Sequence, residues 1–86
     1  MKPQRVCIRW IDARSKAGDY PAAVAKVIPA VEMFSSGPFV NEDEENVRFA
    51  EDTYQEGDGE QRFREVSVIP KSFIRFMKIE DWPEAE

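Results

Sequence analysis

Apolar and polar residues alternate along much of the chain, which is the pattern of half-buried β-strands. The first such run, Arg5–Asp12, is rich in β-branched and aromatic residues, which favour strands. Its two alternating sets are Val6, Ile8 and Trp10, and Cys7, Arg9 and Ile11. Because both sets are partly apolar, we expect a central strand, with Cys7 packed in the core as a small hydrophobic residue.

A second extended segment, Val31–Val40, is interrupted by Gly37 and Pro38, which predict a bulge, a bend or an edge position. The polar stretch Asn41–Asn46 then joins it to a further alternating segment, Val47–Tyr54. The two segments are expected to form a hairpin. The following stretch, Gln55–Gln61, contains two glycines and is typical of an exposed loop.

The last third of the chain predicts two more strands separated by a short break. Arg62–Ile69 alternates so that Val66 and Val68 are expected on the inner face. Pro70, Lys71 and Ser72 interrupt the pattern, and Phe73–Ile79 resumes it. A strand, a one-turn break and a closing strand would let the final strand pair with the first.

One segment, Tyr20–Ile28, has the spacing of an amphipathic helix. Asp19 is a suitable N-cap, Pro21 is tolerated in a first helical turn, and Pro29 ends the run. Because so short a helix is unstable alone in water, we expect it to lie on the sheet and close one end of the core.

Length and composition indicate one globular domain spanning residues 1–86, with an ordered core over about 4–80 and a frayed acidic tail at 81–86. The chain is 42% hydrophobic and 34% charged, and it has no apolar stretch long enough to span a membrane. The single cysteine and the lack of a signal-peptide pattern predict a cytoplasmic protein. Its net charge of −5 disfavours nucleic acid and favours a protein partner with a basic surface.

The residue types present argue against catalysis. With no histidine, the chain lacks the most common general base and metal ligand. Asn41, Asp43, Glu45 and Asp52 approximate a calcium-loop spacing, but the sixth place holds Asn46 where glycine is needed. We therefore expect no enzyme activity, no catalytic residues, no cofactor and no metal site.

Two groups of residues are candidates for binding. Trp10, Asp12 and Arg14 place an aromatic surface beside mixed charge at the end of the first strand, although Trp10 is also in phase with the core. Lys71 and Ser72 lie in the break before the last strand. The sequence leaves open whether Trp10 and Trp82 belong to the core or to a binding surface.

Two motifs resemble known families. Residues 6–13 (VCIRWIDA) and 66–74 (VSVIPKSFI) resemble segments of small uncharacterised phage and prophage proteins, and the second is similar to the strand–turn–strand signature of Sm-like barrels. The resemblance implies a small Sm-like or related β-barrel, often oligomeric. Together with the residue pattern, it predicts a mainly β fold with one short helix, either a small five-stranded barrel or a strongly bent antiparallel sheet. It also implies that Asn41–Asn46 and Pro70–Ser72 occupy the positions that hold an RNA base.

The chain departs from that family in two respects. Its helical segment follows the first strand, whereas an Sm-like protein carries its helix before it. Four carboxylates at residues 42–45 would also repel phosphate.

These observations favour a non-enzymatic binding module of phage or prophage type, acting on a protein partner through a sheet edge and acidic loops. If phage-encoded, it would act in the host cytoplasm. The alternatives are an Sm-like RNA or nucleotide binder and an acidic inhibitor of a host defence enzyme. We also expect a homo-oligomer formed by strand pairing along one edge, composed of Val66, Ser67, Val68 and Ile69.

Overall fold

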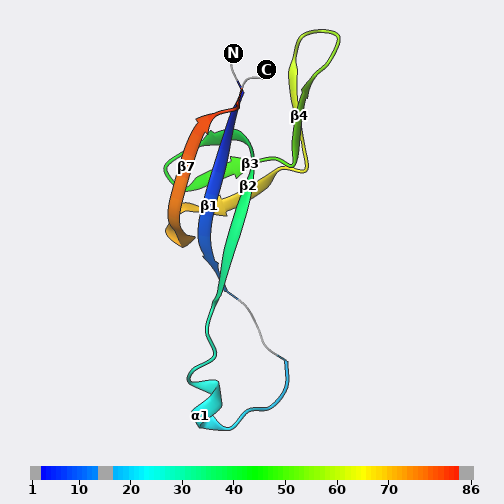
Figure 1. The fold of residues 1–86 in the computed structure, drawn as a ribbon. Coiled ribbons are helices and arrows are strands. Elements are labelled where there is room, and N and C mark those ends of the chain that lie inside the picture. Colours follow the sequence, from blue (N-terminus) through cyan, green and yellow to red (C-terminus); the bar gives the residue numbers. More distant parts are fainter. Residues whose placement is uncertain (1–2, 14–16, 84–86) are drawn as a thin grey trace.

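The computed structural model describes residues 3–13 and 17–83 and contains a strongly bent antiparallel sheet (Figure 1). Its five strands lie in the order β6-β3-β2-β1-β7. Their bounds are β1 Gln4–Asp12, β2 Val31–Glu42, β3 Asn46–Phe49, β6 Ser67–Pro70 and β7 Ile74–Asp81. The predicted mainly β fold with a central first strand is therefore confirmed.

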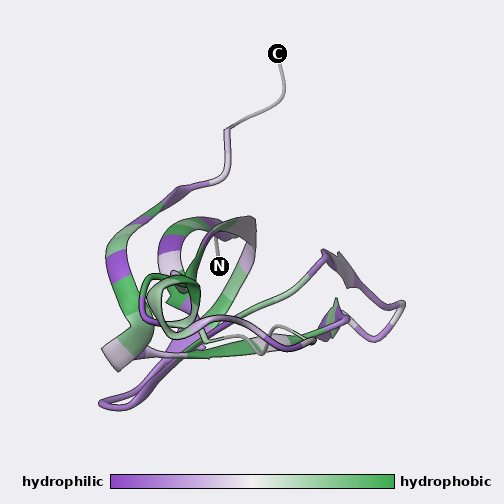
Figure 2. Ribbon diagram, turned by 90° about the horizontal axis from the view of Figure 1, so that it is seen from below, coloured by the Kyte–Doolittle hydropathy of each residue, from purple (hydrophilic) through white to green (hydrophobic). Residues whose placement is uncertain are grey.

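Strand β2 bends the sheet by changing partners along its length. Its first part pairs with β1 from Val31 to Pro38, and its remainder pairs with β3 from Phe39 onward. The change of partner falls at Gly37 and Pro38, where the sequence predicted a bulge, a bend or an edge position. The β2–β3 register also shifts between Phe39 and Asn41. Figure 2 shows the resulting curl of the sheet around its interior.

The last strand pairs with the first, as the break in the sequence predicted. A 3₁₀ turn, η1 (Lys71–Phe73), separates β6 from β7, and β7 runs antiparallel to β1. Within the described residues β6 and β7 do not pair with each other, so the sheet is open and the predicted barrel is not closed. Strand β7 continues through Asp81, and the Trp82 N–H donates to the Pro3 carbonyl (2.9 Å). The remainder of the expected tail, residues 84–86, lies outside the described residues.

Two predicted strands are each divided in the structure. The segment expected at Val47–Tyr54 forms β3 and then β4 (Asp52–Gln55), and the segment expected at Arg62–Ile69 forms β5 (Gln61–Arg64) and then β6. Strands β4 and β5 make a separate two-stranded hairpin that projects from the main sheet (Figure 1). Glu65 has a φ of 57°, and this left-handed residue turns the chain from β5 into β6.

The predicted helix is shorter than expected and does not cover the sheet. Helix α1 comprises only Ala22–Ala25, and all four residues are exposed. It lies at the tip of the long connection between β1 and β2, far from the sheet (Figure 1). The expectation that it closes the core was wrong, because β1 and β2 extend beyond the core and carry their connection away from it. Neither α1 nor any other helix among the described residues could span a bilayer.

The core is small and lies inside the bend of the sheet. The most buried side chains are Val6 and Ile8 of β1, Val47 and Phe49 of β3, and Ile69 of β6. Trp10, Phe39, Ile74, Met77 and Ile79 pack around them. The opposite face of β1, β2 and β7 has no cover among the described residues, and Cys7 lies on it, exposed. The expectation that Cys7 is a core residue was therefore wrong.

Candidate functional site

The break before the last strand and the acidic turn after β2 lie together. The Lys71 N–H donates to the Glu45 carbonyl (2.7 Å), and the Lys71 ammonium donates to Glu42 Oε1 (3.1 Å). A shallow pocket here is lined by Glu44, Glu45, Asn46, Pro70, Lys71 and Ser72. The fold thus joins the two segments that the Sm-like resemblance paired.

Asp43 organises the acidic turn. Its Oδ1 accepts hydrogen bonds from the N–H groups of Glu45 (2.9 Å) and Asn46 (2.8 Å), and its Oδ2 accepts one from the Arg48 guanidinium (2.9 Å). The Arg48 hydrogen bond, followed by the two backbone hydrogen bonds, lowers the pKa of Asp43 from 3.8 to about 2. Both carboxylate oxygens of Asp43 thus hold the turn together.

The electrostatics of this pocket are unfavourable for a phosphate. Its one cation, Lys71, is paired with Glu42, and Glu44 and Glu45 line the same hollow. An anionic ligand would have to displace or approach these carboxylates, at a cost that is greatest at low ionic strength. The pocket suits a cationic or neutral group better.

The structure describes two members of the other predicted binding group, Trp10 and Asp12. Trp10 is half-buried against the core, and its indole Nε1–H donates to Ser35 Oγ (3.1 Å). Asp12 is half-buried at the end of β1, opposite Val31 of β2. Arg14 lies outside the described residues. Trp10 thus packs against the core, on the same face of β1 as Val6 and Ile8.

Strand β6 forms one edge of the sheet, as expected for the predicted oligomer edge. However, the predicted side-chain phase was wrong: Val68 is 52% exposed, whereas Ile69 is only 3% exposed and packs in the core. Val66, just before the strand, is also exposed. The sheet bends so that Ile69 lies opposite Val47, and this places the two valines outside.

The hydrogen bond between Lys71 and Glu45 fixes which backbone groups of β6 face β3. Because the Lys71 N–H donates to Glu45, and antiparallel strands exchange such bonds at every second residue pair, Ile69 and Ser67 also bond to β3. The N–H and C=O groups of Val68, which lies between them, therefore point away from β3 toward the open edge. Pro70 has no N–H to offer there.

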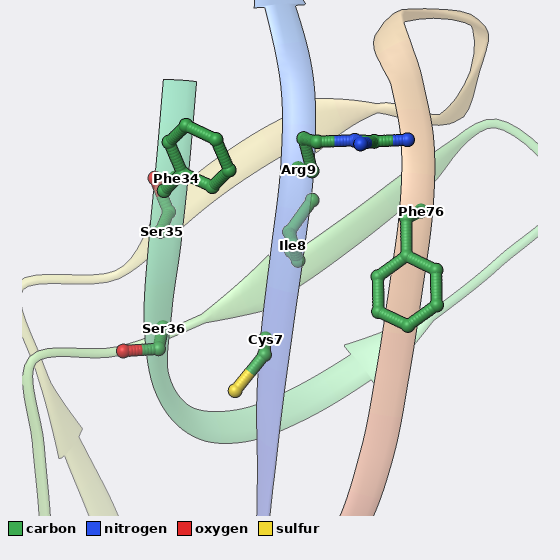
Figure 3. A pocket seen from close by; sticks show the side chains of 7 residues that line it. All are labelled: Cys7, Ile8, Arg9, Phe34, Ser35, Ser36 and Phe76. Carbon is green, nitrogen blue, oxygen red and sulfur yellow. The ribbon is translucent and has the colours of Figure 1, made fainter. Parts of the chain in front are cut away.

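A groove on the outer face of the sheet was not predicted. Its volume is about 500 Å³, and its lining is Cys7, Ile8, Arg9, Phe34, Ser35, Ser36 and Phe76. Phe34 and Phe76 stand on either side of β1 (Figure 3). Both faces of Arg5–Asp12 are partly apolar in the sequence, and this pattern predicts full burial as readily as it predicts one uncovered apolar face.

Trp82 is held against the end of the sheet. Its ring lies 5.8 Å from the Arg5 guanidinium carbon, and Arg5 in turn binds Glu80 (2.7 Å). The Arg5 and Lys78 hydrogen bonds lower the pKa of Glu80. Trp82 remains 42% exposed, so it belongs to the surface at the margin of the outer face.

In the part of the chain that the structure describes, no three cysteine or acidic side chains lie together as a metal site. Comparisons of the chain with protein-family models, curated proteins and solved structures gave no match.

Proposed function

We propose that the chain is a non-enzymatic protein-interaction module that binds an extended segment of its partner along the open edge of β6. The observation that carries this proposal is the outward orientation of the Val68 N–H and C=O, flanked by the exposed side chains of Val66 and Val68. An edge of this kind supplies main-chain hydrogen bonds to an added strand, and its side chains supply specificity.

The charge beside this edge favours a basic partner. Glu44 and Glu45 are exposed in the acidic turn, which is hydrogen-bonded to the end of β6 through Lys71. The whole chain carries a net charge of −5. An extended segment with lysine or arginine beside apolar residues would therefore match both the edge and its surroundings.

The test uses peptides of about ten residues, selected from a random display library on the immobilised protein. We expect selected sequences to be basic and β-prone, and to bind in solution with an affinity that falls at least tenfold in Val68→Pro. That substitution removes the one N–H within β6 that faces the edge, while Val68→Ala retains it and should bind nearly normally. Peptides whose affinity is the same for folded Val68→Pro and for the wild type would contradict the proposal.

A second candidate is the binding of RNA or a nucleotide by an Sm-like arrangement. It is supported by the meeting of Asn41–Asn46 and Pro70–Ser72 in one pocket and by the pairing of the last strand with the first. The carboxylates in that pocket weigh against it. A labelled single-stranded RNA should then show a salt-sensitive anisotropy change that Lys71→Ala and Ser72→Ala reduce. Equal binding by both variants and the wild type would eliminate this candidate.

A further inference from the structure

The outer face of β2, β1 and β7 carries two large aromatic side chains in an exposed position. The strand register places Phe34, Arg9 and Phe76 side by side in one row, and Ser36, Cys7 and Lys78 in the next. Phe34 is 75% exposed and Phe76 is 55% exposed, and the groove between them follows β1 (Figure 3). Surface aromatic residues grouped in this way are typical of an interface.

The single chain has little interior to compensate for this exposure. Among the described residues, only Val6, Ile8, Val47, Phe49, Ala50 and Ile69 are buried hydrophobic residues. One face of the three-strand layer therefore contributes nothing to burial unless another surface covers it.

The charges on this face identify the kind of surface that fits. Arg9 lies 3.5 Å from Glu32 on the β2 side of the groove, and Glu80 binds both Arg5 (2.7 Å) and Lys78 (3.4 Å) on the β7 side. Both signs are thus present around an apolar centre. A strongly anionic partner such as nucleic acid would find each of these cations already beside a carboxylate.

In a two-fold symmetric interface residue i of one copy meets residue j of the other, so a face that carries Arg9 and Glu32 beside an apolar centre can set each of them against its opposite on a second copy. We infer that the outer groove, defined by Cys7, Arg9, Phe34, Ser36 and Phe76, is the interface of a homodimer. Two copies pack their β2–β1–β7 layers face to face, as the sheets of a β-sandwich do. Phe34 and Phe76 form the buried centre, and Arg9 and Glu32 of each copy meet charges of opposite sign on the other.

The size of the layer sets the expected strength of the dimer. Three strands, paired over eight residues between β1 and β2, present a plane of about 14 by 27 Å. Even with the relief of the side chains, each copy buries less than the roughly 800 Å² of a standard interface. The dissociation constant should therefore lie in the micromolar range, about 1–100 μM. The β6 edge is not part of this face, so each copy keeps it open.

The first experiment is sedimentation equilibrium of the purified chain from about 1 to about 500 μM. We expect a monomer–dimer equilibrium in the wild type. Phe34→Ser and Phe76→Ser should each weaken association at least tenfold without lowering the Tm of the monomer, because both side chains are exposed there. Val27→Ser is the matched control: Val27 is 73% exposed but lies in the β1–β2 connection, so its loss should leave the dimer unchanged.

The second experiment exploits the paired charges. Arg9→Glu makes the face acidic and Glu32→Arg makes it basic, so each variant should be monomeric alone, while an equimolar mixture should form a heterodimer. An interface elsewhere would give no such complementation.

Two results would overturn the inference: a wild-type chain that stays monomeric throughout the concentration range, or a dimer that survives both phenylalanine substitutions. Val68→Pro separates this inference from the proposed strand addition, since it should lower peptide affinity at least tenfold and leave the dimer intact. A dimer lost only in Val68→Pro would place self-association at the β6 edge and reject the outer groove.

Discussion

Gly37 of β2 lies directly against the backbone of Ala50, just after β3. A Cβ built at Gly37 would overlap with the Ala50 carbonyl oxygen, and the Ala50 N–H donates to the carbonyl of the neighbouring Pro38 (2.8 Å). This contact is where β2 leaves β1 and joins β3. The bend that encloses the core therefore depends on the absence of a side chain at residue 37.

Gly37→Ala should destabilise the fold by about 2–4 kcal/mol, because the added methyl group meets backbone that cannot move without disturbing the β2–β3 ladder. Gly57→Ala is the control, since a Cβ there has no neighbour within 4 Å. Urea denaturation monitored by tryptophan fluorescence measures both. Similar unfolding free energies for the two variants would show that the sheet tolerates a side chain at the bend.

The two adjacent residues of β6, Val68 and Ile69, should respond oppositely to a charge. Ile69→Asp places a carboxylate in the core and should cost about 4 kcal/mol or more, enough to unfold a domain of this size. Val68→Asp, on the exposed side, should remain folded with a cost below about 1 kcal/mol. Circular dichroism melts of both variants would decide the phase of the strand, and a folded Ile69→Asp would show that Ile69 does not face the core.

Asp43 should contribute to acid stability. The fold lowers the pKa of Asp43 from 3.8 to about 2. The stabilisation of the fold by the ionised Asp43 carboxylate is therefore complete above pH 3.8 and is lost as the pH falls toward 2. In Asp43→Asn that contribution is missing at neutral pH, and the difference in Tm from the wild type should shrink between pH 4 and about 2. Thermal melts across this range, with Glu44→Gln as the control, test it. A constant difference in Tm would exclude the titration of Asp43 as the cause.

Glu65 is the only non-glycine residue with positive φ in the described part of the chain. Glu65→Gly should be neutral or stabilising by up to about 1 kcal/mol, because glycine adopts this conformation without a steric cost. Glu51→Gly, at an exposed position without positive φ, should instead cost about 0.5–1 kcal/mol. Denaturation midpoints of the two variants provide the comparison, and a clear loss of stability in Glu65→Gly would mean that its side chain matters more than its backbone.

The sequence was sufficient for features that depend on local pattern. Alternation in Arg5–Asp12 identified a central strand, and the break at Pro70–Ser72 indicated how the last strand returns to pair with the first. These predictions succeeded because side-chain periodicity and proline determine backbone structure over a few residues, and both can be read directly from the sequence.

Tertiary structure alone decided which faces are covered. Nothing in the sequence around Glu65 predicts its left-handed backbone, which separates β5 from β6 and assigns them to different sheets. The inward position of Ile69, in place of Val68, follows from that turn and from the partner strand it meets.

The exposure of the outer groove is also decided by tertiary structure. Alternation indicates that Cys7 and Phe34 share a face, but not whether another element covers it. That depends on where the β1–β2 connection goes, and here it carries α1 away from the sheet (Figure 1). Burial is a property of how distant segments meet, and a pattern of single residues along one strand contains no information on that meeting.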